Sequence, residues 1–208
     1  MNTELLSCRR LTVGIVFPAY TLEHVQVNRI YADITERFPY QQMQHLPDGG
    51  RMSNPNGDFF IQTTRLQVNE NIDYFHSTKD KAIDLFGIAQ SRLKIPQFTN
   101  FGIKLTAALP VENKDAASTL EQSAFASIKS ALDLLSPERK GTGLRVVIHK
   151  EGIHEVKIEP LFSDISQIYI DLDVQYPQPF TDINSIGPKM GAAYDYLFGE
   201  IRAFLEAL

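Results

Sequence analysis

The sequence predicts an α+β fold made of two strand–helix–strands–helix halves, with antiparallel sheets and with helices packed on one face. Two local patterns carry this prediction. Residues 167–176 alternate between apolar and polar side chains without interruption, which is the pattern of a half-buried strand. Residues 190–208 place apolar side chains at steps of four and three residues, as an amphipathic helix does. The same order of elements occurs in residues 8–95 and in residues 97–208, which we expect to be two halves of one globular unit, related by an internal duplication.

The first half begins with a strand and a helix. Residues 11–17 are rich in β-branched and apolar residues and end at Pro18, which predicts a strand. From Thr21, apolar residues recur at helical spacing until Pro39 stops the helix. A second strand is expected at residues 40–46.

Turn sequences divide the next part of the chain. Pro-Asp-Gly-Gly at 47–50 and Asn-Pro-Asn-Gly at 54–57 are both typical of turns, and residues 51–53 between them are too few to assign. Residues 58–69 predict one long bent strand or a broken pair. Residues 77–80 have the spacing of a capping box, so we expect them to begin the helix that closes the first half.

The second half repeats this order. Residues 98–109 predict a strand, and the capping-box sequence at 118–121 predicts the start of a helix that runs to Leu135. Residues 144–150 and 153–161 predict a hairpin. The alternating strand and the terminal helix follow. We expect the apolar stripe of that helix to lie in the core, although Phe198 and Leu205 beside it could form a dimer contact.

Composition limits the classes of function. The chain is 43% hydrophobic and 22% charged, has one cysteine (Cys8), and carries a net charge of -5. Its 20 Lys and Arg residues are scattered, which disfavours nucleic-acid binding because counterion release needs clustered cations. We find no signal peptide and no apolar stretch long enough to span a bilayer, so we expect a cytoplasmic protein without membrane contact.

Familiar catalytic motifs are absent from the sequence. It contains no Gly-x-Ser-x-Gly elbow, no nucleotide-binding glycine loop and no His-Glu-x-x-His pair. This disfavours the common nucleotide-dependent and serine-hydrolase chemistries, and we expect no cofactor.

The polar side of the alternating strand holds the main candidates for chemistry. Asp171 and Asp173 lie about 6.5–7 Å apart on one face, from the rise per residue of a strand. Two such carboxylates could hold a divalent cation or act as an acid/base pair, with His149 from the preceding hairpin as a further group. His154, Glu155 and Glu159 are other potential ligands nearby. The alternative is a solvated sheet face in which Arg145 and Lys157 balance the acids.

A second polar row lies in the first half. Arg65, Gln67 and Asn69 alternate with apolar residues, and Arg can bind carboxylates and phosphates through two parallel hydrogen bonds. With Tyr169 of the alternating strand, these residues are the candidates for binding a small polar ligand. A solvated face is again the alternative.

Two resemblances follow from these patterns. The element order resembles the TATA-box-binding-protein fold, but that family's DNA-binding face is basic and apolar, whereas the equivalent face here would hold Asp171 and Asp173. The stretches 64–75 and 169–174, the latter followed by a long terminal helix, are similar to a sporadically distributed family of uncharacterised bacterial proteins. Those proteins tend to have Asn-Trp where this chain has Tyr74-Phe75. This resemblance implies no known activity.

The sequence therefore favours a non-catalytic binding or protein-interaction module that uses an open polar sheet face. A protein partner, a homodimer or a small polar ligand would each fit such a face. One alternative is an enzyme or metal-binding protein that acts on a small polar substrate through Asp171 and Asp173, and a second is nucleic-acid binding.

Overall fold

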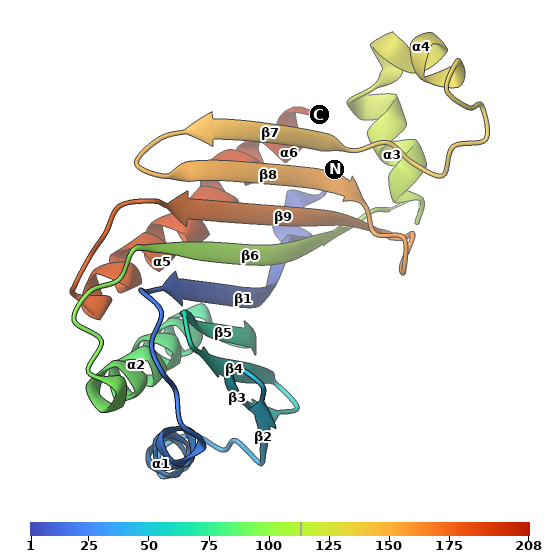
Figure 1. Cartoon of the computed structure of the whole chain (residues 1–208). Helices are drawn as coiled ribbons and strands as arrows, with labels where there is room; N and C mark the ends of the chain where they lie inside the picture. The colour runs from blue at the N-terminus through green and yellow to red at the C-terminus, as the bar shows by residue number, and fades with distance from the viewer. Residues whose placement is uncertain (113) are drawn as a thin grey trace. The chain divides into compact units, whose positions relative to one another are not determined.

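The computed structural model of the protein describes residues 1–112 and 114–208. Its strands form one nine-stranded antiparallel sheet in the order β2-β3-β4-β5-β1-β6-β9-β8-β7 (Figure 1). This confirms the predicted α+β class. The strands are β1 (Ser7–Val16), β2 (Gln42–Leu46), β3 (Gly49–Asn54), β4 (Gly57–Gln62), β5 (Arg65–Asn71), β6 (Asn100–Pro110), β7 (Leu144–His149), β8 (Ile153–Pro160) and β9 (Gln167–Tyr176).

The helices occur between the groups of strands and at the end of the chain. They are α1 (His24–Thr35), α2 (Phe75–Leu93), α3 (Ala116–Ser123), α4 (Lys129–Asp133), α5 (Ile186–Tyr196) and α6 (Arg202–Ala207). Short helical turns are η1 (Thr3–Leu5), η2 (Ala126–Ile128), η3 (Ile183–Ser185) and the π-helical turn η4 (Leu197–Ile201). In the part of the chain that the structure describes, no helix has both the length and the hydropathy needed to cross a bilayer.

The chain divides into two compact units, each assembled from segments that are distant in the sequence. The first unit contains Met1–Arg9, Leu105–Asp173 and Ala193–Leu208, and the second contains Arg10–Lys104 and Val174–Ala192. The unit boundaries therefore fall within β1, β6, β9 and α5. The halves 8–95 and 97–208 and the internal duplication stay predictions from element order.

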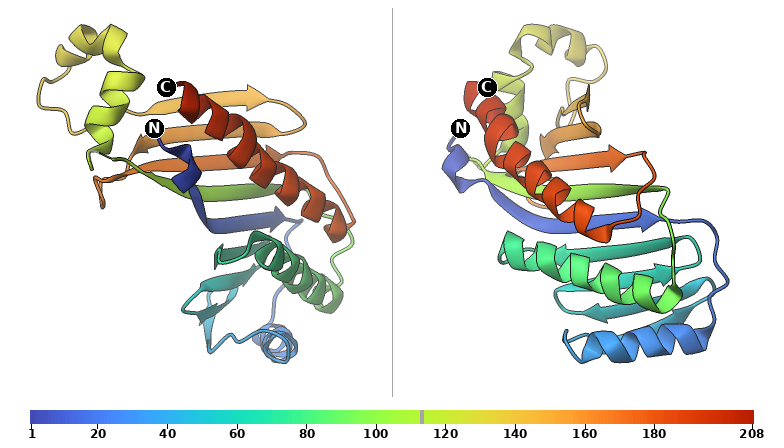
Figure 2. Two further views of the ribbon diagram at one scale, coloured as in Figure 1. Left: turned by 180° about the vertical axis from the view of Figure 1, so that it is seen from behind. Right: turned by 90° about the vertical axis from the view of Figure 1, so that its left-hand side faces the viewer.

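In the second unit, α1 and α2 cover one face of the strands (Figure 2). Leu66 and Val68 of β5 point into this core and are fully buried, because alternate residues of a strand face opposite sides. The Phe59 ring of β4 meets Phe86 of α2 edge-on, with ring centroids 6.1 Å apart.

Several predicted boundaries in this unit are wrong in detail. The helix expected from Thr21 begins at His24, and the turn expected at 47–50 already enters β3 at Gly49. Residues 58–69 form a broken pair, β4 and β5. α2 begins at Phe75 rather than at the expected capping box, because Ser77 Oγ donates to the backbone oxygen of Tyr74 inside the first turn.

In the first unit, the predicted hairpin and the alternating strand are confirmed as β7, β8 and β9. The helix predicted to run to Leu135 is instead broken into α3, η2 and α4. Asp115 caps α3 by accepting a hydrogen bond from the backbone N–H of Ser118, so the expected cap residue lies within the first turn. Leu135, the predicted last residue of this helix, is 84% exposed.

The terminal helix follows the predicted stripe only as far as its π-helical turn. Met190, Leu197 and Ile201 are buried as expected. The wider turn η4 shifts the buried position after it by one residue, since a π turn holds more residues than an α turn. Leu205 is therefore fully buried while Phe204 is 42% exposed, which leaves Leu205 unable to serve the dimer contact considered from the sequence.

Candidate functional site

The second unit has an open polar face on the side of its strands that α1 and α2 do not cover. We define this polar face by the residues Thr12, Arg51, Ser53, Asp58, Phe60, Arg65, Gln67 and Asn69. They alternate with buried residues of the same strands, such as Met52, Phe59 and Val68. The antiparallel register sets Asp58 beside Asn69, and Asn69 beside Thr12. The predicted row Arg65, Gln67 and Asn69 is therefore part of a larger face.

Hydrogen bonds join this face across β3, β4, β5 and β1. Arg51 Nη2 lies 2.8 Å from Asp58 Oδ2, and the amide nitrogen of Asn69 donates to Asp58 Oδ1 at 2.5 Å. The amide oxygen of Asn69 accepts from Thr12 Oγ1 and from Gln67 Nε2, both at 2.9 Å. Asn69 is thus the centre of the network, and at 7% exposure it organises the face rather than reaching a ligand.

Arg65 and Gln67 remain accessible at one end of the face. A β-carbon placed on Gly14 would lie 3.8 Å from Gln67 Oε1 and 3.9 Å from Arg65 Cδ, so the two side chains border that glycine. Gln67 directs Oε1 towards this spot because its Nε2 is held by Asn69. Arg65 is exposed, and its side chain makes no hydrogen bond or ion pair within the described residues. A ligand at this spot would meet the guanidinium of Arg65, the amide oxygen of Gln67 and the backbone of Gly14, which carries no side chain.

On the helix side of the same strands, a buried cluster contains Glu70, Tyr40 and Lys81. The Tyr40 hydroxyl donates to Glu70 Oε1 at 2.5 Å, and Lys81 Nζ lies 2.6 Å from the same oxygen. Lys81 Nζ is also 4.7 Å from the centre of the Tyr40 ring, within the range of a cation–π contact. Burial raises the pKa of the Tyr40 hydroxyl, and its hydrogen bond to Glu70 raises it further. This cluster ties the sheet to α2.

Sequence reasoning missed this cluster and five members of the polar face, which are Thr12, Arg51, Ser53, Asp58 and Phe60. Glu70 follows Leu66 and Val68 at the same two-residue spacing, so the pattern predicts an apolar residue there. An acidic residue at such a position indicates a buried ion pair. Arg51 was missed because residues 51–53 were not assigned to a strand. Asp58 was missed with it, because Asp58 belongs to the polar face through its ion pair with Arg51.

The other predicted site residues, Asp171, Asp173, His149 and Tyr169, all belong to the first unit. Asp171 is only 4% exposed, Asp173 and Tyr169 are half-buried, and His149 is exposed. Neither aspartate is free of interactions with other residues. His154 is buried and meets the Tyr196 ring of the terminal helix, with centroids 5.3 Å apart, so it faces away from the polar side of β8.

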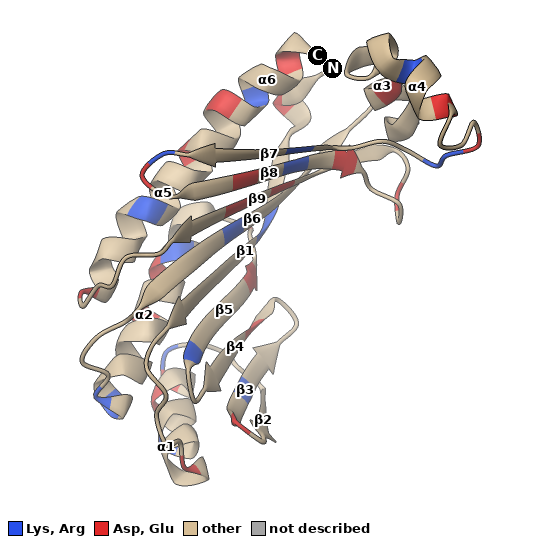
Figure 3. Cartoon of the chain, turned by 45° about the horizontal axis from the view of Figure 1, so that its top comes forward, with Lys and Arg blue, Asp and Glu red and all other residues tan. Residues whose placement is uncertain are grey.

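The charged groups of the hairpin neutralise one another. Arg145 Nη2 and Lys157 Nζ lie 2.6 Å and 2.9 Å from the carboxylate oxygens of Glu155, and acidic and basic positions follow one another along β8 in Figure 3. The hydrogen bond from Arg145 and then that from Lys157 lower the pKa of Glu155 to about 2. Among residues 1–112 and 114–208, no three His, Cys, Asp or Glu side chains come together as a metal site.

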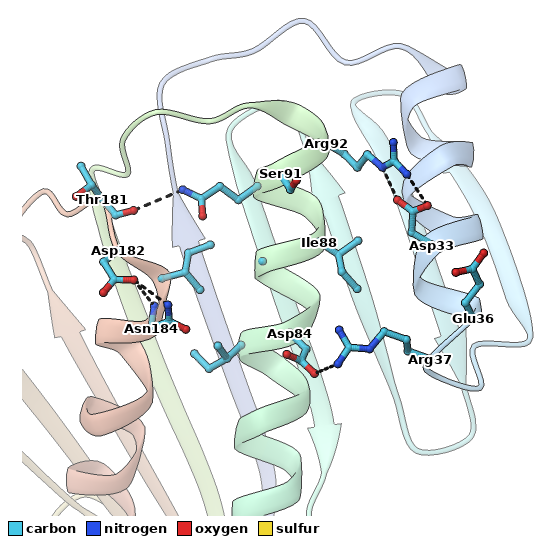
Figure 4. Close-up of a pocket in the computed structure, with 14 residues that line it drawn as sticks. Asp33, Glu36, Arg37, Asp84, Ile88, Ser91, Arg92, Thr181, Asp182 and Asn184 are labelled. Carbon is cyan, nitrogen blue, oxygen red and sulfur yellow. Dashed lines mark hydrogen bonds and ion pairs between the residues drawn. The ribbon is translucent and has the colours of Figure 1, made fainter.

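A groove of about 590 Å³ lies among α1, α2 and η3 (Figure 4). Arg37 Nη2 lies 2.6 Å from Asp84 Oδ2, and Arg92 binds both carboxylate oxygens of Asp33. The hydrogen bond from Arg92 lowers the pKa of Asp33. The pair of Arg92 with Asp33 links α2 to α1, and the pair of Arg37 with Asp84 links α2 to the segment just after α1. A ligand in the groove would have to displace these ion pairs or bind around them, which makes the polar face the better candidate site.

Comparison of the chain with protein-family models and with curated proteins gives no match.

Proposed function

We propose that the protein is a non-catalytic binding module and that the polar face of its second unit binds a partner at Arg65 and Gln67. The observation that carries the proposal is the contrast between the two ends of this face. At one end, Asp58 and Asn69 are held by internal hydrogen bonds. At the other, the guanidinium of Arg65 is exposed and has no protein partner among the described residues.

The chemistry of these groups indicates the class of partner. An Arg guanidinium binds a carboxylate through two parallel hydrogen bonds, and an amide oxygen accepts one hydrogen bond from an N–H or O–H group. A partner that presents a carboxylate beside an N–H donor would satisfy both Arg65 and Gln67 Oε1. The absence of a side chain at Gly14 leaves room for it to approach the backbone.

Binding at this spot alone would be weak. An exposed ion pair contributes about 0–1 kcal/mol, so a partner of useful affinity has to contact more of the face. Phe60 and Arg51 offer further contact area, since the Arg51 guanidinium carbon lies 5.5 Å from the centre of the Phe60 ring. The cytoplasmic location, the bacterial family resemblance and the Asp171/Asp173 alternatives stay predictions of the sequence.

Side-chain NMR resonances can test the anionic part of this site with small probes. We expect N-acetylglycinate, which has a carboxylate next to an amide N–H, to shift the Arg65 Nε–Hε and Gln67 amide signals in a saturable way. The neutral N-acetylglycine amide should leave the Arg65 signal unchanged because it lacks the anionic group.

A variant that places a negative charge beside Arg65 tests whether the probe binds to its guanidinium. Gln67→Glu should abolish the probe-induced shift, because its carboxylate would occupy the Arg65 guanidinium. Gln41→Glu adds the same charge at an exposed position outside the defined face and should retain the shift. The proposal fails if the anionic and neutral probes behave alike, or if both variants respond like the wild type.

A further inference from the structure

The outermost strand of the first unit, β7, leaves one edge unpaired. Its only neighbour in the strand order of the described residues is β8. Val146 and Val147 in its centre are 42% and 51% exposed, and Arg145 is its only side chain with a full charge. An exposed apolar edge strand is a template for pairing with another chain, and proteins normally protect such edges.

The opposite end of the strand order shows how such protection works. β2 has exposed Gln42, Gln44 and His45 and is bracketed by Pro39 and Pro47, which cannot donate backbone hydrogen bonds. β7 has no flanking prolines, and two of its four exposed residues, Val146 and Val147, are apolar. Exposed large apolar residues also concentrate in the same part of the chain, and they include Ile128, Leu134, Leu135, Phe162 and Ile165.

The side chains of β7 complement a second copy of themselves. In an antiparallel pair, residues that face each other point to the same side of the sheet. A two-fold axis at Val146 would set Val146 against the partner's Val146 and Leu144 against the partner's Ile148. An axis at Arg145 would instead oppose two arginines, which is destabilising, and an axis at Val147 would set Leu144 against the partner's Lys150.

Charges also favour the axis at Val146. Arg145 would then lie opposite the partner's Val147, and within each copy Val147 pairs with Glu155 of β8. The backbones of Arg145 and the partner's Glu155 would be two strand spacings apart, which is about 9.5 Å. Their long side chains can meet over this distance, with the partner's Val147 between them. Because Arg145 is 65% exposed in its side chain, it is free to bridge its own Glu155 and that of the second copy.

We propose that two copies of this chain associate through β7, as antiparallel strands related by a two-fold axis at Val146. This interface is isologous, so it closes after two copies.

The register can be tested by disulfide formation. Val146→Cys should give a covalently linked dimer under mild oxidation, because facing residues of an antiparallel pair have Cα separations that a disulfide accommodates. Leu144→Cys, on the same side of the same strand, should not link, since it would face the partner's Ile148. The wild type, which contains only Cys8, controls for the natural cysteine.

Sedimentation equilibrium provides the second arm of the test. The wild type should sediment with twice the chain mass. Val147→Lys should halve this mass, because the new lysine would lie beside the partner's Arg145. Val25→Lys makes the same change at a valine of α1 that is 47% exposed and should stay dimeric. A monomeric wild type, a dimer unaffected by Val147→Lys, or more efficient linkage of Leu144→Cys than of Val146→Cys would overturn the proposal.

Discussion

Two neighbouring residues of β5, Asn69 and Glu70, lie at the centres of two polar clusters with different environments. Asn69 joins Asp58 on the open face of the second unit, where solvent reaches Arg51 and Gln67. Glu70 is 3% exposed beneath α2, between Tyr40 and Lys81. If Asn69 is lost, Asp58 keeps its ion pair with Arg51, whereas the loss of Lys81 removes the cation that is paired with the buried carboxylate of Glu70. We therefore expect the fold to depend more on the buried cluster than on the open one, as the proposed binding role of the polar face requires.

Lys81→Met should have the largest effect on stability. It removes the positive partner of a buried carboxylate while keeping the apolar side-chain volume. We expect the free energy of unfolding to fall by about 3 kcal/mol, as is usual when one member of a buried ion pair is deleted. Denaturant titration measures this value. The double variant Glu70→Gln with Lys81→Met should recover part of the lost stability, because it no longer buries an unpaired carboxylate. If Lys81→Met alone is as stable as the wild type, the buried cluster does not contribute more to stability than the open one.

Tyr40→Phe should have a smaller effect that depends on pH. It removes one hydrogen bond to the buried carboxylate, which should cost about 2 kcal/mol near neutral pH. The folded state raises the pKa of Tyr40, whereas an unfolded tyrosine titrates at about 10. Above a pH of about 10, the tyrosine hydroxyl loses its proton in the unfolded state but keeps it in the folded state. The contribution of Tyr40 to stability is therefore fully present below this pH and declines as the pH rises further.

The difference between Tyr40→Phe and the wild type should therefore narrow at alkaline pH. Unfolding titrations at neutral and at alkaline pH measure the change. A constant difference would show that the hydroxyl proton of Tyr40 does not contribute in this way.

Asn69→Ala tests the open cluster and should cost less. It removes the hydrogen bonds of Asn69 to Thr12, Gln67 and Asp58, but Asp58 keeps its ion pair with Arg51, so we expect a loss of about 1 kcal/mol. Denaturant titration beside Lys81→Met gives the comparison directly. A loss as large as that of Lys81→Met would mean that the polar face is as important for the fold as the buried cluster.

The sequence predicts strand positions best where one side of the strand is buried, because apolar residues then alternate with polar ones. β8 and β9 were found close to their observed positions because buried side chains largely alternate with more accessible ones along both strands, whereas no residue of β7 is buried. The expected row Arg65, Gln67 and Asn69 does share one face, but it lies in a different unit from Tyr169.

Features that depend on pairing between distant segments could not be found in this way. The contact of Thr12 with Asn69 requires the β1–β5 register, which no local pattern specifies. The π-helical turn at Leu197–Ile201 likewise places Leu205 rather than Phe204 in the core, and the spacing of apolar residues does not indicate such a turn. The helix expected to reach Leu135 breaks after Ser123, and the exposed leucines beyond it belong to the surface rather than to the core.

Arg65→Ala provides the most direct test of the central claim, which is that the polar face serves binding and contributes little to the fold. We expect its free energy of unfolding to stay within about 0.5 kcal/mol of the wild type, since the Arg65 side chain is exposed and makes no hydrogen bond or ion pair within the described residues. The N-acetylglycinate shift at Gln67 should disappear. Arg29→Ala removes another exposed arginine without an internal partner in the described residues, and it should preserve both properties. An Arg65→Ala variant that retains the shift, or that unfolds as readily as Lys81→Met, would contradict the account.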